Sequence, residues 1–251
     1  MVQLEHGGLI QMVDSHVHIG YSEKCDKSYS LDQYGKWLES NGMDSAVVFP
    51  NVTDYQTAFQ VNESLLNECF LYKGNIKFYP FLIINTFEKE MLPQVCQKGV
   101  YGLKIHPSIL RCFADNTNFE EFYSLKLPVT VHCGRDSFSR IDYLILAAKQ
   151  FPDTNFIAAH LGGNTTDLII RALTLLEKEK LPNLYLDTSN GKSPRLIKKA
   201  IDILGIDKIL FGSDEPYADL TVQKFCIECL NLNESDTNKI MGDNIRRLLN
   251  G

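Results

Sequence analysis

The sequence predicts an α/β fold, specifically a (β/α)8 TIM barrel in which parallel strands are surrounded by helices. Short apolar segments rich in β-branched residues alternate with amphipathic segments, and eight such units in 251 residues fit the size of this fold. The strand segments are mostly apolar, as is typical of parallel strands buried on both faces. No Gly-x-Gly-x-x-Gly segment follows the first strand, which disfavours an open doubly wound sheet. We find no linker or close internal repeat and therefore expect one domain, residues 1–251.

Each expected strand is an apolar run that ends at a polar or turn-forming residue. The eight strand ranges are 10–18, 45–49, 76–85, 102–106, 128–132, 155–160, 183–187 and 208–214. Helices are expected where apolar residues recur at helical spacing; Ser30 is the predicted N-cap of the first, and Gly42, Gly74 and Gly99 end the first three. The helix ranges are 29–42, 53–73, 87–98, 118–125, 139–151, 167–180, 193–204, 220–232 and 235–249.

Composition limits the classes of partner. A net charge of −6 argues against nucleic acid or an anionic membrane as the main partner, and leaves a small molecule. No apolar run approaches the ~18 residues of a transmembrane helix, and no signal peptide is recognisable. The seven cysteines are an odd number scattered through expected core elements, so we predict reduced thiols and a cytoplasmic location.

Five of the six histidines lie at the carboxyl ends of predicted strands: His16, His18, His106, His132 and His160. In a barrel these ends converge on one site. Because strand side chains alternate, Asp14, His16 and His18 are expected on one face. Neutral imidazoles, together with the carboxylate of Asp214 at the end of the eighth strand, suit zinc or a similar divalent ion. Such an ion lowers the pKa of its water towards ~7, and Asp214 would also accept a proton.

Six sequence blocks in this order resemble the amidohydrolase superfamily, and most closely the amidohydrolase-related family that includes aminocarboxymuconate semialdehyde decarboxylase. The blocks span nearly the whole chain and are Asp14-Ser-His-Val-His18, Gly102-Leu-Lys-Ile-His-Pro107, Val131-His132, Ala159-His-Leu-Gly-Gly163, Leu210-Phe-Gly-Ser-Asp-Glu-Pro216 and Ile240-Met-Gly-Asp-Asn-Ile-Arg-Arg-Leu248.

The resemblance implies one divalent metal ion, zinc or alternatively manganese, held by His16, His18, His132 and Asp214. It also implies that His160 acts near the metal, as an acid/base group or as a ligand. Lys104 occupies the position where some superfamily members carry a carboxylated lysine that bridges two metals. We expect one ion here, with Lys104 as an unmodified substrate-binding or electrostatic group.

Several of these candidate site residues also have a purely structural interpretation. Taken singly, His132 and His160 each fit a hydrogen-bonded core histidine. His106 either orients a substrate or packs at a loop. Arg135 either binds a substrate carboxylate or is a solvated loop residue, and Tyr217 is expected to line the pocket.

Three functions remain open at this point. The first is metal-dependent hydrolysis of an amide, lactone or ester-like bond, in which Asp214 moves the proton while His160 and Lys104 stabilise the oxyanion. The second is non-oxidative decarboxylation of an unsaturated or aromatic acid, which would need an anion clamp such as Arg135 or Arg140. The third is a barrel that binds a small molecule without turnover. The short loops predict an open site or a homodimer in which a second subunit supplies a wall.

Overall fold

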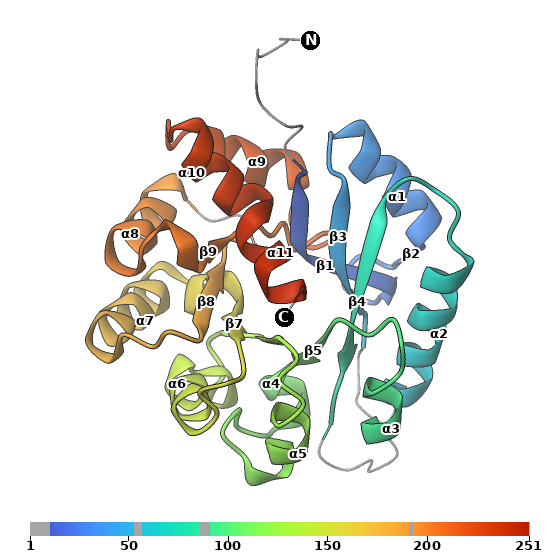
Figure 1. The fold of residues 1–251 in the computed structure, drawn as a ribbon, viewed down its shortest axis with the longest axis horizontal. Helices are drawn as coiled ribbons and strands as arrows, with labels where there is room; N and C mark the ends of the chain where they lie inside the picture. The colour runs from blue at the N-terminus through green and yellow to red at the C-terminus, as the bar shows by residue number, and fades with distance from the viewer. Residues whose placement is uncertain (1–10, 53–56, 86–90, 191–192, 251) are drawn as a thin grey trace.

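Eight parallel strands and one antiparallel strand form one curled sheet in the computed structural model, which describes residues 11–52, 57–85, 91–190 and 193–250 (Figure 1). The strands lie side by side in chain order, except that β2 flanks β1 on the outer edge. The strands are β1 (Val13–Ser22), β2 (Lys27–Tyr29), β3 (Ser45–Pro50), β4 (Lys77–Ile83), β5 (Gly102–Ile105), β6 (Val129–Val131), β7 (Phe156–Ala158), β8 (Leu184–Asp187) and β9 (Ile209–Leu210). The predicted barrel class is confirmed.

The two edges of the parallel sheet meet through the segment that follows β9. The backbone N–H of Ser15 donates to the carbonyl of Phe211 at 2.9 Å, and that of Asp214 donates to the carbonyl of His16 at 2.9 Å. The N–H of His18 donates to the carbonyl of Glu215 at 2.8 Å. Because β9 itself has only two residues, these bonds complete the ring and hold Asp214 directly beside β1.

Helices surround the ring, and α11 crosses one of its ends (Figure 1). Their bounds are α1 (Leu31–Ser40), α2 (Ala58–Leu71), α3 (Met91–Val95), α4 (Pro107–Leu110), α5 (Glu120–Tyr123), α6 (Ile141–Gln150), α7 (Thr166–Glu179), α8 (Pro194–Leu204), α9 (Leu220–Glu228), α10 (Glu234–Asn238) and α11 (Asn244–Leu249). Ser30 caps α1 as predicted, because its side chain accepts from the N–H of Gln33. Among the described residues, no helix has the length and apolar character needed to cross a membrane.

The interior of the ring is apolar at the end covered by α11. Val13, Val47 and Tyr79 lie early in their strands and pack in one cluster with Ile245 and Leu248 of α11. Among the described residues, this packing fills the amino-terminal end of the barrel, opposite the carboxyl ends of the strands.

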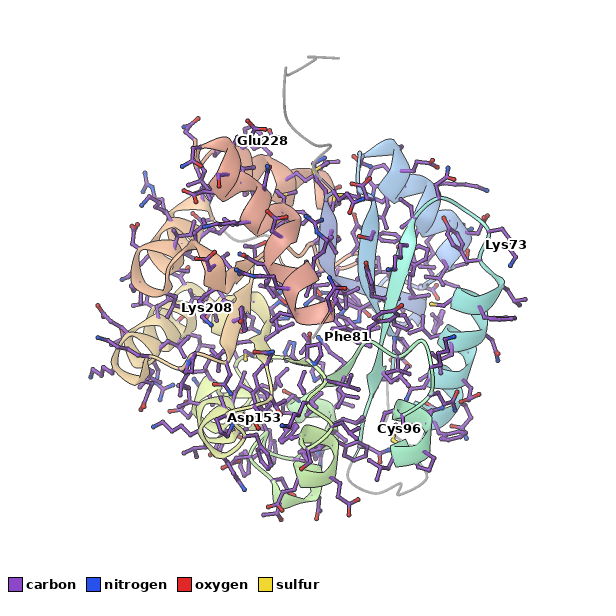
Figure 2. All side chains as sticks on the ribbon, viewed as in Figure 1. Lys73, Phe81, Cys96, Asp153, Lys208 and Glu228 are labelled. Carbon is purple, nitrogen blue, oxygen red and sulfur yellow. The ribbon has the colours of Figure 1, made fainter. Side chains whose placement is uncertain are left out.

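Phe81 fills the centre of the ring, where Figure 2 labels it, and it requires a glycine at position 102. A Cβ atom there would lie 2.4–2.6 Å from three carbons of the Phe81 ring. A larger cluster packs between the sheet and the surrounding helices.

Element bounds differ from expectation in a systematic way. Most strands are shorter than predicted, whereas β1 continues four residues past His18 to pair with β2. The first residues of the predicted helices 53–73 and 87–98 lie outside the described residues. In the described remainder of each range the structure has α2 and α3. The predicted helix 235–249 is divided into α10, a π-helical turn and α11.

Candidate metal centre

Three side chains from the two meeting edges of the sheet converge at the floor of the barrel mouth. The Nε2 atoms of His16 and His18 lie 3.2 Å apart, and Oδ1 of Asp214 lies 3.3 Å from the first and 3.4 Å from the second. One ligand atom from each residue falls within 4.8 Å of the others, which is a spacing that one metal ion can span. The prediction that His16 and His18 share one face is confirmed.

Asp14 does not share that face, so this part of the prediction is wrong. A shift in the β1–β3 register between Asp14 and Val17 interrupts the alternation of side chains. The Asp14 carboxylate instead accepts hydrogen bonds from the backbone N–H and the hydroxyl of Ser213, at 3.0 and 2.6 Å. Asp14 therefore anchors the segment that carries Asp214.

Asp187 is a further candidate residue of the site, which the sequence patterns did not indicate. It ends β8, and its Oδ2 lies 2.8 Å from Nδ1 of His16. Its Oδ1 accepts hydrogen bonds from the backbone N–H groups of His160 at 2.9 Å and Ser189 at 3.1 Å. The signal was available, because Asp187 closes the seventh predicted strand as Asp214 closes the eighth.

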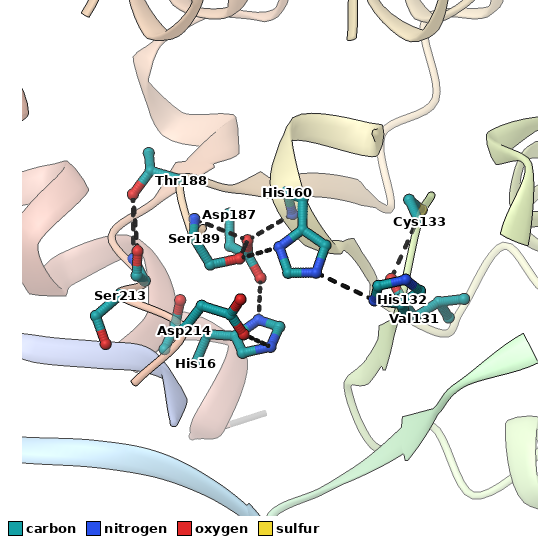
Figure 3. A network of polar contacts seen from close by, with 12 residues as sticks. His16, Val131, His132, Cys133, His160, Asp187, Thr188, Ser189, Ser213 and Asp214 are labelled. Atoms are coloured by element: carbon teal, nitrogen blue, oxygen red, sulfur yellow. Dashed lines mark hydrogen bonds and ion pairs between the residues drawn. The ribbon is translucent and has the colours of Figure 1, made fainter. Parts of the chain in front are cut away.

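His160 lies in a 3₁₀ turn just after β7 rather than at the end of the predicted strand 155–160. Its Nδ1 contacts the hydroxyl of Ser189 at 2.7 Å, and its Nε2 lies 3.1 Å from Nδ1 of His132 (Figure 3). His160 and Asp214 both adopt positive φ, 61° and 74°, a conformation that is uncommon for residues other than glycine. Such backbone geometry tends to gather at functional sites.

His132 lies outside the group formed by His16, His18 and Asp214. Its ring stacks on that of His106 at a centroid distance of 3.9 Å and meets His160 edge-on. The assignment of His132 as a fourth ligand therefore stays a prediction.

Lys104 is buried at the same floor, with Nζ 3.2 Å from Nε2 of His16 and 4.3 Å from the centroid of the Phe49 ring. Burial lowers the pKa of its ammonium group to about 8. This places one positive charge next to three potential metal ligands.

Burial also lowers the pKa values of the histidines, since removal from water disfavours their charged form. It lowers the pKa of His18 to about 4, and those of His106 and His160 to about 3. These rings are therefore neutral at pH 7, which is the form that binds metals.

The pKa values of the two buried acids are lowered as well, but for a different reason. Burial alone would raise the pKa of Asp187 and Asp214, but the facing histidines and the hydrogen bonds they receive outweigh it, and both pKa values lie below their usual range. Both groups are carboxylates at neutral pH.

A cavity of about 440 Å³ opens above this floor. His106, Lys104 and Tyr217 line it as expected. Further polar lining residues that the sequence patterns did not indicate are Ser22, Glu23, Lys24, Asn51, Asn164 and Asn190. Tyr21 to Lys24 belong to the hairpin region that follows the barrel part of β1, so the hairpin supplies one wall of the cavity.

Arg135 and Arg140 are not among the residues that line this cavity, and Arg135 is exposed. Lys104 and Lys24 are its positively charged lining residues. The role of Arg135 in substrate binding stays a prediction.

The donor set fits a divalent ion. Nδ1 of His16 faces a carboxylate, so it carries the proton and Nε2 presents a lone pair towards His18 and Asp214. Two imidazole nitrogens and a carboxylate oxygen facing one point are the ligand types that zinc and manganese accept. His16, His18 and Asp214 would hold the ion, and Asp187 would orient His16.

The chain belongs to the amidohydrolase family, because the family model described as Amidohydrolase matches residues 13–251. No curated protein matches the sequence.

Solved structures of low sequence identity share the fold. A dihydroxybenzoic acid decarboxylase from Polaromonas sp. JS666, with bound manganese and the inhibitor 2-nitroresorcinol, is 16% identical with a TM-score of 0.76, covering 96% of this chain and 97% of its own. An amidohydrolase from Burkholderia multivorans with bound zinc is 14% identical with a TM-score of 0.77, covering 96% and 99%. A 2,6-dihydroxybenzoate decarboxylase complexed with 2,6-dihydroxybenzoate is 16% identical with a TM-score of 0.77, covering 96% and 98%.

Proposed function

We propose that this protein is a metal-dependent hydrolase that acts on a small amide, lactone or ester. The observation that carries the proposal is the position of Asp214, whose carboxylate contacts both His16 and His18 and also lines the cavity. A divalent ion held there by His16, His18 and Asp214 would make water acidic enough to ionise near neutral pH. Zinc and manganese, the metals of two structural relatives, are the candidates.

The chain's own residues divide the work of hydrolysis. Asp214 is ionised at neutral pH and accepts a proton from the attacking water. The ammonium of Lys104 stabilises the negative charge that develops on the substrate carbonyl oxygen, and His160 borders the same space. The hydrolysed acyl bond yields a carboxylic acid and an alcohol or an amine. His106 and Tyr217 contact the substrate from the cavity wall.

Decarboxylation of a small unsaturated or aromatic acid is the second candidate. Pro50, Val52, Ile83 and Ile109 give the cavity an apolar side that would accept a planar ring, while Lys104 supplies a cation for the carboxylate. Two structural relatives are dihydroxybenzoate decarboxylases, which supports testing this reaction.

One experiment separates the two reactions. The protein is loaded with zinc or manganese and incubated with two panels: amides, lactones and esters, and aromatic or unsaturated carboxylic acids. Appearance of the carboxylate together with the alcohol or amine, measured by liquid chromatography and mass spectrometry, supports hydrolysis, whereas release of labelled CO2 from carboxyl-labelled acids supports decarboxylation. Asp214→Asn should lower the observed rate roughly 100- to 10,000-fold, while the exposed Asp153→Asn serves as the matched control. No turnover of either panel by metal-loaded protein would contradict both reactions.

A further inference from the structure

Asp187 contacts two histidines of the site by different routes (Figure 3). Its Oδ2 meets Nδ1 of His16 directly, at 2.8 Å. Its Oδ1 meets the hydroxyl of Ser189, whose oxygen lies 2.7 Å from Nδ1 of His160. All four residues are buried, so water does not compete for these bonds.

The direction of each hydrogen bond follows from the carboxylate. Oδ1 of Asp187 already accepts from the backbone N–H groups of His160 and Ser189, and such groups can only donate. Asp187 is therefore an acceptor throughout, and the single hydroxyl proton of Ser189 points to it. The Ser189 oxygen must then accept from His160, which requires a proton on Nδ1 of His160.

The same chain of hydrogen bonds extends from His160 to the ring of His132. A neutral His160 with its proton on Nδ1 has a lone pair on Nε2, 3.1 Å from Nδ1 of His132. Nδ1 of His132 must carry a proton to complete that bond, which leaves the lone pair of His132 on Nε2. Burial of His160 supports the neutral form, since a charged ring would lose its hydration.

We propose that Ser189 is a positioning residue: it donates its hydroxyl proton to Asp187 and accepts the Nδ1–H of His160. His160 in turn accepts the Nδ1–H of His132, so this chain of hydrogen bonds fixes the Nδ1–H tautomer of both rings. His16 acquires the same tautomer directly from Asp187. One carboxylate thus sets the tautomer of three histidines and places the lone pair of each ring on Nε2, where that of His160 accepts the N–H of His132. If His132 binds the metal, Nε2 is the atom that does so. The inference concerns the metal-free protein and does not depend on which reaction it catalyses.

The test is tautomer measurement by long-range 1H–15N correlation NMR on metal-free protein labelled with 15N-histidine. In the unaltered protein, His16, His160 and His132 should all give the Nδ1–H pattern. In Ser189→Ala, Nδ1–H of His160 loses its acceptor, so His160 should gain the Nε2–H form. His132 should gain the same form, because an Nε2–H on His160 can no longer accept from His132. His16 should keep its pattern, since its bond to Asp187 is direct.

Ser139→Ala is the matched control, because Ser139 is equally buried and its hydroxyl contacts Ser108 rather than an imidazole. It should leave all three patterns unchanged. The proposal is overturned if Ser189→Ala preserves the Nδ1–H form of His160, or if Ser139→Ala produces the same change. Should Ser189→Ala fail to fold, the unaltered protein still decides: an Nε2–H pattern for His160 there overturns the relay, whatever the outcome of the activity assays.

Discussion

Nδ1 of His16 lies 2.8 Å from Oδ2 of Asp187, a residue 171 positions further along the chain. This bond joins the first strand of the barrel to its seventh parallel strand, across the ring interior. It holds the His16 ring so that Nε2 faces His18 and Asp214. Histidines that bind metals commonly donate their other N–H to a carboxylate in this way, which fixes the ring and makes it a better ligand.

Asp187→Asn should therefore weaken metal binding without removing any of the three central ligand candidates. We expect a roughly 10- to 100-fold rise in the metal dissociation constant, as is usual when such an outer partner is changed. Competition with a chromophoric chelator measures it. Asp153→Asn, which alters only an exposed ion pair with Lys126, should leave the constant unchanged. Equal affinity in Asp187→Asn and unaltered protein would contradict the orienting role.

Metal content tests the centre itself. Protein purified without added metal should contain about one equivalent of zinc or manganese per chain, measured by plasma mass spectrometry. The double variant His16→Ala/His18→Ala should lose it, because two of the three clustered ligand atoms disappear. Two equivalents would point instead to Lys104 as a carboxylated bridge, and no uptake on titration would remove the metal-based mechanism.

Asn62 joins α2 to the end of β4 by hydrogen bonds and should be important for the stability of the fold. Its amide accepts from the backbone N–H of Ile83 at 3.0 Å and donates to the carbonyl of the same residue at 2.8 Å. Asn62→Leu has a similar volume but leaves both buried groups unpaired, so we expect a loss of roughly 2–5 kcal/mol in the free energy of unfolding. Urea denaturation measures it. Asn75→Ala, which removes only an exposed bond to Glu39, should cost far less; equal losses would refute the prediction.

Cysteine reactivity should follow burial. All seven cysteines are free thiols. Burial raises the pKa of Cys133 from 9.0 to about 12. The reactive thiolate fraction at pH 8 is then about one in ten thousand instead of about one in ten.

Brief alkylation at pH 8 followed by peptide mass spectrometry should label the exposed Cys96 and Cys229 well before Cys133. Labelling of Cys133 should appear after denaturation, because the unfolded thiol regains its ordinary pKa. Rapid labelling of Cys133 in folded protein would show that the strand β6 region opens readily.

Local patterns in the sequence predicted much of the fold and part of the site. Apolar runs identified each of the parallel strands, although most predicted ends extended too far. The convergence of His16, His18 and Asp214 was also predictable, because parallel strands in a ring bring all their carboxyl ends to one rim. The homodimer stays a prediction.

The sequence by itself determined the order of strands and helices, the residue types at the strand ends and the family to which they point. Only the tertiary structure decided how those residues are connected. It revealed the irregularity that turns Asp14 away, the hairpin wall, the exposure of Arg135, and the contacts that join Asp187, Ser189 and His160. The physical reason is that periodicity depends on neighbours a few positions apart. A hydrogen-bond partner, in contrast, depends on backbone torsions and side-chain directions of residues far apart in the chain.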